Sequence, residues 1–287
     1  MLTIAINTPS LNHERYVGVF IDSVFSQDYP NLTLSVVDDA STDRNYEILR
    51  QLQARHGFVL QRNEARRGIA ATLNRAYAAN RSSDLVFTIA SDDLLAPGFA
   101  RRVNDYFTMN PGVDAIVGNV VFIDADGTVT RRFQAWAEGR IDLVKWAGGK
   151  QQAMPNWLVV RRAVMESEKP YDEANALEDL PFFIRIVQKY DVRAVDFDLL
   201  HYRKHEQSYS SQKAYDVYLA EQKLHERYRA EPFYHSYARN ARLNWFLAFS
   251  GSRKSEAWRL LGALWPDLWR LRVLKGLARL FFYHPHP

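Results

Sequence analysis

Residues 85–98 read LVFTIASDDLLAPG, an apolar stretch that runs directly into two adjacent aspartates, Asp92 and Asp93. The apolar run predicts a buried strand, and Pro97 with Gly98 predicts a turn after it. No cation stands beside the two carboxylates in the sequence. Successive side chains of an extended chain point to opposite sides, so we expect one carboxylate to face a divalent ion and the other to face sugar hydroxyls or a neighbouring loop.

The type of ion follows from the ligand atoms. Carboxylate oxygens suit Mg²⁺ or Mn²⁺, which keep several waters and take further ligands from substrate phosphates. Such an ion would stabilise a diphosphate leaving group, which favours a nucleotide-activated donor over a metal-water hydrolase. A dedicated zinc site would need more nitrogen ligands clustered nearby, and the sequence shows none beside this pair.

This segment belongs to a pattern in which short apolar runs alternate with helical ones over about the first 110 residues. Continuous apolar strands separated by helices predict an α/β fold, with a mainly parallel sheet and helices on both faces. The predicted strands span 2–7, 32–39, 58–63 and 85–90, and the predicted helices span 14–27, 69–79, 97–110 and a segment capped by Ser41 or Thr42.

Three polar clusters follow predicted strands. They are NTPSLN (7–12), DDASTD (38–43) and SDD (91–93). Asp and Ser also cap helices and form turns, so each cluster alone has a purely structural explanation. In parallel sheets the ligand crevice lies beyond the carboxyl ends of the strands, so we expect the three clusters to meet there and bind a ligand.

The rest of the chain predicts further sheet structure and then a helical appendage. A hairpin or edge strands around the turn Asp126-Gly127 are followed by a helix over 178–190 and a strand over 192–202. From Ser211 onward the pattern is helical and rich in Trp, Tyr and Arg. We therefore expect a boundary near residue 210, between a sheet domain and a helical C-terminal region.

The composition excludes several classes of protein. The absence of cysteine excludes disulfides, thiolate nucleophiles and thiolate zinc sites. The net charge is +4, but residues 201–287 hold 15 Lys/Arg against 7 Asp/Glu (+8), which leaves 22 against 26 (−4) before them. Because the basic character is confined to the last third, we expect no nucleic-acid partner. With no signal peptide and no long apolar run in view, we expect a cytoplasmic protein without a transmembrane helix.

Six blocks of the sequence form a recognisable series: TPSLNHERYVGVFIDSVFSQDYPNLTLSVVDDASTD, RNEARRGIAATLNRAYAA, DLVFTIASDDLLAPG, MPNWLVVRRAV, YDEANALEDLPFFIRI and LLHYRKHEQSYS. In this order and spacing they resemble the motifs of family 2 glycosyltransferases of the GT-A fold, over roughly residues 2–211. The resemblance implies a Rossmann-like, mostly parallel sheet flanked by helices, with a GT-A catalytic domain over 1–210. Nucleotide-sugar binding would lie in about 1–110 and the acceptor side in about 111–210, and 211–287 would be the helical C-terminal region.

The resemblance also implies which residues bind the nucleotide-sugar. They are Pro9, Ser10, Asn12, Asp39, Arg67, Gly68 and Asp92. Of these, Asp39 would accept a hydrogen bond from the base, and Asp92 would contact the ribose or the surroundings of the metal.

A divalent ion, Mn²⁺ or Mg²⁺, is implied with Asp93 as its ligand and His205 approaching it. Asp179 matches the catalytic base, and Glu178 would support it or the acceptor. A carboxylate at the start of a helix can accept a proton from an acceptor hydroxyl, and Pro181 fits a first-turn position. The structural alternatives are that Glu178 and Asp179 only cap this helix and that His205 is simply exposed.

Two departures from the family narrow the expected reaction. Leu11 stands where the family commonly has an aromatic residue that stacks on the base, which leaves the nucleobase open, with a UDP-sugar favoured. The Gln-X-X-Arg-Trp element of processive synthases is absent after Asp179, which favours a hexosyltransferase-type enzyme that adds one sugar. The family resemblance implies inversion at the anomeric carbon. We expect a saccharide acceptor, and favour a lipid-linked one used in cell-surface polysaccharide or glycan assembly.

The end of the chain, LWPDLWRLRVLKGLARLFFYHPHP (264–287), predicts an amphipathic helix. Its apolar face consists of Leu271, Leu274, Ala278 and Phe281. A basic stripe beside this face consists of Arg272, Lys275 and Arg279. Trp265 and Trp269 add rings of the kind favoured at membrane interfaces. Two interpretations remain open: the helix lies on an anionic membrane surface, making the protein peripheral on the inner face of the cytoplasmic membrane, or its apolar face packs on the catalytic domain.

Three other functions have less support in the sequence. A nucleotidyltransferase could use a similar sheet and acidic metal site, but would want a glycine-rich basic loop after the first strand, where NTPSLNHER has no glycine. A signalling receiver domain would place its acidic pair after the first strand, whereas VVDD follows the second. A catalytically dead nucleotide-sugar-binding protein is disfavoured because Asp93, Asp179 and His205 are all present.

Overall fold

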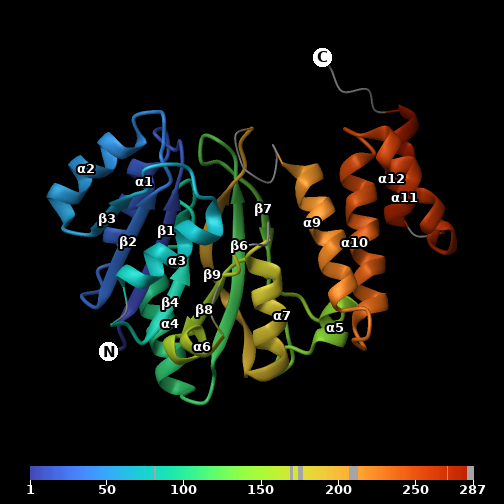
Figure 1. The fold of residues 1–287 in the computed structure, drawn as a ribbon. Helices are drawn as coiled ribbons and strands as arrows, with labels where there is room; N and C mark the ends of the chain where they lie inside the picture. Colours follow the sequence, from blue (N-terminus) through green and yellow to red (C-terminus); the bar gives the residue numbers. More distant parts are fainter. Residues whose placement is uncertain (81, 169–170, 174–176, 207–212, 270, 283–287) are drawn as a thin grey trace. The chain divides into compact units, whose positions relative to one another are not determined.

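The computed structural model describes residues 1–80, 82–168, 171–173, 177–206, 213–269 and 271–282. The chain forms two compact units, which are described separately. Unit 1 comprises Met1–Asp142 and Gln151–Val217, and unit 2 comprises Leu143–Lys150 and Tyr218–Pro287. A sheet with flanking helices makes up unit 1, and unit 2 is helical (Figure 1). The predicted α/β class and the C-terminal helices are thereby confirmed.

The described strands of unit 1 form one sheet in the order β3-β2-β1-β4-β8-β6-β9-β5, with β7 paired to β6. The neighbours from β3 to β4 run parallel, as do β6 and β9. The pairs that involve β5, β7 or β8 are antiparallel, so the second half of the sheet is mixed. The strands are β1 (Ile4–Ser10), β2 (Leu32–Asp38), β3 (Val59–Arg62), β4 (Leu85–Thr88), β5 (Leu94–Leu95), β6 (Ala115–Ile123), β7 (Val129–Phe133), β8 (Leu158–Arg161) and β9 (Val192–Arg203).

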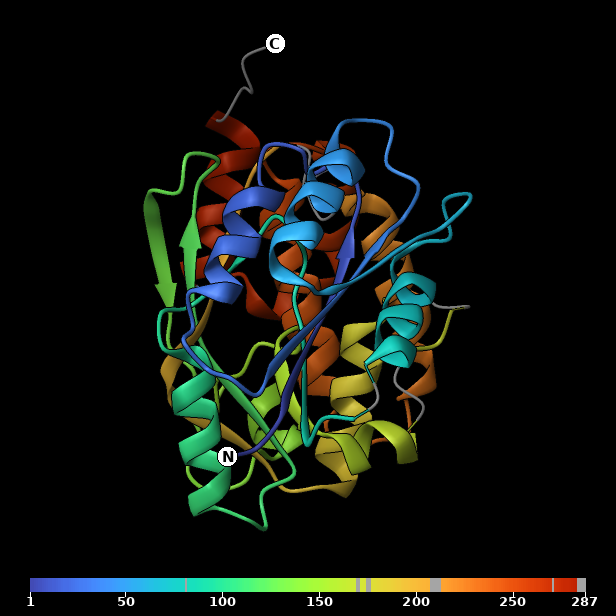
Figure 2. The same ribbon diagram turned by 90° about the vertical axis from the view of Figure 1, so that its left-hand side faces the viewer.

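Helices cover both faces of this sheet (Figure 2). Side-chain alternation along β1 sends Ile4 and Ile6 to the face that α1 and α4 cover, where they join Phe20 and Phe99 in the main hydrophobic core. On the opposite face lie α3, α6 and α7. The helices of unit 1 are α1 (Val17–Phe25), α2 (Asn45–His56), α3 (Ile69–Ala79), α4 (Phe99–Met109), α6 (Arg162–Glu168) and α7 (Asp179–Lys189).

The sheet topology brings the polar clusters to one edge. Because β1, β2 and β4 are parallel neighbours, they end at the same edge: Ser10 lies beside Asp38, and Thr88 lies beside Asn7 of β1. The short strand β5 then pairs antiparallel with β9, with Leu94 opposite His201. Because of this pairing, the turn after β4 lies beside the end of β9.

Unit 2 is built around close contacts between helices. Its helices include α5 (Leu143–Ala147), α10 (Tyr234–Phe249), α11 (Lys254–Ala263) and α12 (Leu271–Phe282), together with most of α9 (Ala214–Arg227). A Cβ on Gly276 of α12 would lie 2.1 Å from a ring carbon of Phe246 in α10, so a glycine is required for this approach. Val273 and Leu280 are buried on the same side of α12.

The apolar face expected from the sequence is a different one. Its residues Leu271, Leu274, Ala278 and Phe281 are exposed, as are Trp265 and Trp269. Within unit 2, α12 therefore packs through the stripe of Val273, Gly276 and Leu280, and not through the predicted apolar face. In the part of the chain that the structure describes, no helix combines the length and the apolarity needed to cross a bilayer.

Candidate active site

A cavity of about 410 Å³ opens at the carboxyl edge of the parallel strands. This volume lies in the range of small-molecule sites. All three polar clusters contribute to its lining, which consists of Pro9, Ser10, Leu11, Asn12, His13, Asp39, Arg66, Gly68, Ile69, Thr72, Ala90 and Asp92. Of the seven residues expected at the nucleotide-sugar, six therefore line one cavity, and the seventh, Arg67, lies in the loop beside them.

Asp39 organises that loop. Its carboxylate accepts hydrogen bonds from the backbone N–H groups of Arg67 (2.8 Å) and Gly68 (2.9 Å) and from Nδ2 of Asn63 (2.7 Å). Gly68 has a φ of +87°, a conformation that a side chain would strain, and α3 begins at the next residue. Asp39 is buried, and these hydrogen bonds fix the shape of the cavity wall.

Asn12 ties the first two clusters together. Its backbone N–H donates to Ser41 Oγ (2.9 Å), and its Oδ1 accepts from the backbone N–H of Thr42 (2.8 Å). Asn12 adopts a left-handed φ of +56°, which asparagine tolerates better than most residues. The expectation that Ser41 or Thr42 caps a helix is wrong, because these groups serve the Asn12 turn and α2 begins later, at Asn45.

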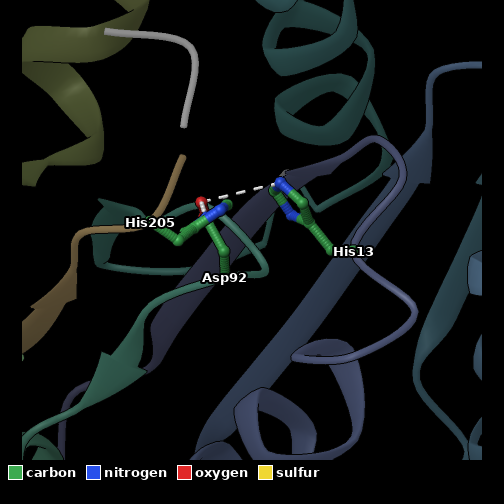
Figure 3. Close-up of side chains that lie close together, drawn as sticks. All are labelled: His13, Asp92 and His205. Carbon is green, nitrogen blue, oxygen red and sulfur yellow. Dashed lines mark hydrogen bonds and ion pairs between the residues drawn. The ribbon is translucent and has the colours of Figure 1, made fainter. Parts of the chain in front are cut away.

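Three side chains that could ligate a metal ion meet beside the cavity: His13, Asp92 and His205 (Figure 3). Asp92 Oδ2 lies 3.0 Å from His205 Nε2 and 3.6 Å from His13 Nε2. One candidate ligand atom from each residue lies within 4.8 Å of the other two. The side chains keep only 16%, 12% and 4% exposure for His13, Asp92 and His205, so the cluster is largely shielded from water.

The protonation states suit a cation. Burial lowers the pKa of His13, and the charge of Asp92 offsets this only in part, so the ring favours its neutral form. Burial acts to raise the pKa of Asp92, but the electrostatic interaction with His13, together with the hydrogen bond and electrostatic interaction with His205, outweighs it and lowers this pKa. The cluster thus offers a carboxylate and imidazole nitrogen, the donor atoms that Mn²⁺ and related ions accept.

The two aspartates have different contacts within the protein. Asp93 was expected at the ion, but its buried carboxylate accepts a hydrogen bond from the backbone N–H of Arg203 (2.8 Å). Burial, and then the charge of Asp92, raise the pKa of Asp93 well above its usual range. Arg203 Nε also donates to the carbonyl of Asp92 (2.9 Å), so the end of β9 clamps this turn. It is Asp92 that faces His205.

The second predicted group, Glu178 and Asp179, lies at the start of α7 and lines a smaller cavity of about 40 Å³. A volume of this size admits one or two water molecules. Asn156 donates a hydrogen bond to Asp179. The capping alternative is not supported for Glu178, which makes no side-chain cap hydrogen bond among the residues that the structure describes.

The two carboxyl groups of this smaller cavity differ in environment. Burial, and then the charge of Asp179, raise the pKa of Glu178 to about 8. Glu178 is therefore protonated at neutral pH. Tyr171 lies in the same wall, with its hydroxyl 2.9 Å from Thr88 Oγ1, and burial raises its pKa above the ordinary range. Because Thr88 ends β4, this cavity lies near the same strand end as the larger one.

Sequence reasoning missed several of these residues. His13 stands directly after the first polar cluster, and that proximity was its only signal. Ser91 belongs to the third polar cluster, but no role was assigned to it. Asn156 and Tyr171 fall inside recognised blocks, but nothing in the pattern singled them out. The sequence shows no nitrogen ligand beside the aspartates, but in the structure the imidazoles of His13 and His205, both distant in sequence, lie near Asp92.

Comparisons with known proteins show the family and the fold of the chain. The family model described as Glycosyl transferase family 2 matches residues 6–166. An uncharacterized glycosyltransferase of Nostoc sp. is 26% identical over 179 residues, which cover 60% of this chain and 54% of that protein, so the match spans about half the length of that relative.

Two solved structures share the fold. Staphylococcus aureus TarS 1–349 in complex with UDP-GlcNAc has a TM-score of 0.61 at 15% identity, over 97% of this chain and 89% of that one. The mannosyltransferase PcManGT from Pyrobaculum calidifontis, in complex with GDP-Man and Mn²⁺, has a TM-score of 0.63 at 16% identity, over 98% and 84%. At these identities the likeness concerns the fold, which is the GT-A fold expected from the sequence.

Proposed function

Because this chain belongs to glycosyl transferase family 2, we propose that it transfers a single sugar from a nucleotide-diphosphate sugar to a hydroxyl group of a saccharide acceptor. The observation that carries this proposal is the cavity at the carboxyl edge of the sheet. Residues from three strand ends line it, and two of them, His13 and Asp92, also belong to the cluster that could bind a metal.

The donor that we favour is a UDP-sugar. One structural neighbour binds UDP-GlcNAc and another binds GDP-Man, so nucleotide-sugars of this size suit the fold. In this chain Leu11 lines the cavity where an aromatic residue would stack on the base. The backbone of Pro9 and Ser10 would border the nucleotide, and the loop held by Asp39 would close over the base.

A divalent ion, Mn²⁺ or Mg²⁺, would be held by Asp92 and His205. Their donor atoms lie 3.0 Å apart, and a carboxylate oxygen with an imidazole nitrogen suits Mn²⁺. When bound, the ion would offset the negative charge that develops on the departing diphosphate. Asp93, bonded to Arg203, would hold the turn that aims Asp92.

Asp179 would be the general base. It would accept the proton of the acceptor hydroxyl while that oxygen forms a bond to the anomeric carbon and the bond from this carbon to the diphosphate breaks. Glu178, protonated at neutral pH, has no site for that proton but can donate a hydrogen bond to the acceptor. A single displacement of this kind inverts the anomeric configuration, as the family resemblance implies.

The acceptor that we favour is lipid-linked. The exposed side chains of unit 2 combine large apolar groups, among them Trp265, Trp269 and Leu271, with the basic residues Arg272, Lys275 and Arg279. Aromatic rings beside Lys and Arg suit the interface of an anionic membrane. A membrane-bound enzyme would meet a lipid-linked saccharide there.

The test is the release of nucleoside diphosphate from a panel of nucleotide-sugars with Mn²⁺, with and without saccharide acceptors. Asp179→Asn should lower the turnover about 10³-fold, because removal of a general base typically costs 10²–10⁴. Glu138→Gln, an exposed carboxyl change outside both cavities, should leave it unchanged. Full activity of Asp179→Asn, or pyrophosphate release from nucleoside triphosphates instead, would overturn the proposal.

A further inference from the structure

His13 is a histidine whose ring is held in one orientation. Its carbonyl accepts the backbone N–H groups of Tyr16 (2.9 Å) and Val17 (2.8 Å), which fixes the backbone just after the Asn12 turn. Its Nδ1 lies 2.8 Å from Ser91 Oγ, and its side chain is 16% exposed. Such anchoring at both backbone and ring is unusual for a residue that only faces solvent.

The hydrogen bonds around Ser91 decide which ring nitrogen carries the proton. Ser91 Oγ donates to Ser10 Oγ at 2.7 Å, and both hydroxyls are buried. Since its single hydrogen is used there, Ser91 can only accept from His13, so Nδ1 carries the proton. The lone pair of the neutral ring is then on Nε2, the nitrogen that points toward Asp92. A partner on one ring nitrogen that leaves the other available is the arrangement found around metal-binding histidines.

The separation of His13 from Asp92 fits a shared ion better than a hydrogen bond. At 3.6 Å, His13 Nε2 is beyond hydrogen-bond reach of Asp92 Oδ2. Two ligand atoms that each lie about 2.1 Å from one ion are separated by roughly 3.0–3.4 Å at octahedral or tetrahedral angles. The separations of 3.0 Å and 3.6 Å from Asp92 Oδ2 are close to these values.

We propose that His13 is a third protein ligand, so that two imidazoles and one carboxylate hold the ion and select Mn²⁺ or a similar transition metal over Mg²⁺. The inference rests on the proposed function, because it specifies the ion at that same cavity. Mg²⁺ prefers oxygen ligands and dehydrates reluctantly, whereas imidazole nitrogen suits transition metals. The preference for Mn²⁺ over Mg²⁺ thus depends on His13, which lies outside the pair Asp92 and Asp93.

The test measures ion binding, not catalysis. Chelator-treated full-length protein is titrated with MnCl₂ and with MgCl₂ by calorimetry, with and without UDP, and the visible absorption of the Co²⁺ complex is recorded. We expect Mn²⁺ to bind at least about tenfold more tightly than Mg²⁺. His13→Ala should weaken Mn²⁺ binding about 10- to 100-fold, change Mg²⁺ binding much less, and alter the Co²⁺ spectrum. His235→Ala removes an exposed imidazole of unit 2 and should change none of these.

Ser91→Ala provides a second test at a positioning residue. It leaves every ligand in place but removes the acceptor of the His13 Nδ1–H bond, so Mn²⁺ affinity should fall about tenfold. Unchanged Mn²⁺ affinity and an unchanged Co²⁺ spectrum in folded His13→Ala would overturn the inference, as would absence of Mn²⁺ binding to the wild type in both conditions. Transfer activity with normal Mn²⁺ binding in His13→Ala would reject this inference alone. Selective Mn²⁺ binding without any nucleotide-sugar turnover would reject the proposed function alone.

Discussion

Replacing Glu178 by glutamine should stabilise the protein at neutral pH and have little effect near pH 5. Burial and the neighbouring charge of Asp179 raise the pKa of Glu178 from 4.5 to about 8 in the folded protein. Between these two values the folded state holds a proton that the unfolded state has released. The free energy of unfolding therefore falls as the pH rises from about 4.5 to about 8, and an amide, which does not titrate, removes this loss.

The size of the effect follows from the same two values. Each pH unit between 4.5 and 7 contributes about 1.36 kcal/mol, which gives a ceiling of about 3.4 kcal/mol at pH 7. Glu178 is only partly buried, so water screens part of this energy and we expect about 2 kcal/mol. For a domain of this size, that corresponds to an increase in Tm of about 4–8 °C.

The assay is thermal unfolding of wild type and Glu178→Gln at pH 5, 6, 7 and 8, followed by circular dichroism. Glu138→Gln, the exposed control, should follow the wild type at every pH. Other groups with shifted pKa values, such as Asp93 and His13, titrate in all three proteins and cancel in the differences. A Tm difference between Glu178→Gln and wild type that does not grow with pH would refute the reasoning, as would a variant that is less stable than wild type at pH 8.

Two further predictions concern the ion and the membrane. Asp92→Asn should lower Mn²⁺ affinity at least about tenfold in calorimetric titrations, whereas Asp93→Asn should stay within about twofold, because its amide oxygen can still accept the same backbone hydrogen bond. Equal losses in both variants would return the ligand role to Asp93. Joint replacement of Trp265 and Trp269 by alanine should weaken binding to phosphatidylserine vesicles about tenfold in co-sedimentation, while Trp136→Ala, an exposed tryptophan of unit 1, should not. Unchanged binding of the double variant would leave these rings without a membrane role.

Local patterns were sufficient for much of the fold. Periodicity predicted the start of α3 after Gly68, which is confirmed. The turn residues Asp126-Gly127 predicted a hairpin or edge strands, and the structure has the hairpin of β6 and β7. Both features depend on a few residues that are adjacent in the sequence, so a short stretch of sequence is enough to predict them. The prediction of a helix cap at Ser41 or Thr42 was wrong because the Ser41 hydroxyl and the Thr42 backbone N–H form hydrogen bonds with Asn12, which is close only in the folded chain.

The same distinction explains the aspartate pair. Alternation along an extended chain predicted two different partners for Asp92 and Asp93. Both residues instead lie in the turn after β4, and their partners differ because of contacts that are distant in sequence. The pairing of Leu94 with His201 decides this, because it places the backbone N–H of Arg203 against Asp93 and leaves Asp92 facing His205.

The sequence by itself therefore determined the α/β class, the polar edge of the sheet and the residue types available there, because each follows from local periodicity and the directions of strands. Only the tertiary structure decided which side chains meet. His13, Asp92 and His205 follow β1, β4 and β9, and no local pattern relates the first and last of them. Their contact exists because the order of strands in the sheet brings three strand ends to one point. Burial at that point lowers the pKa of His13, and the two histidines lower the pKa of Asp92.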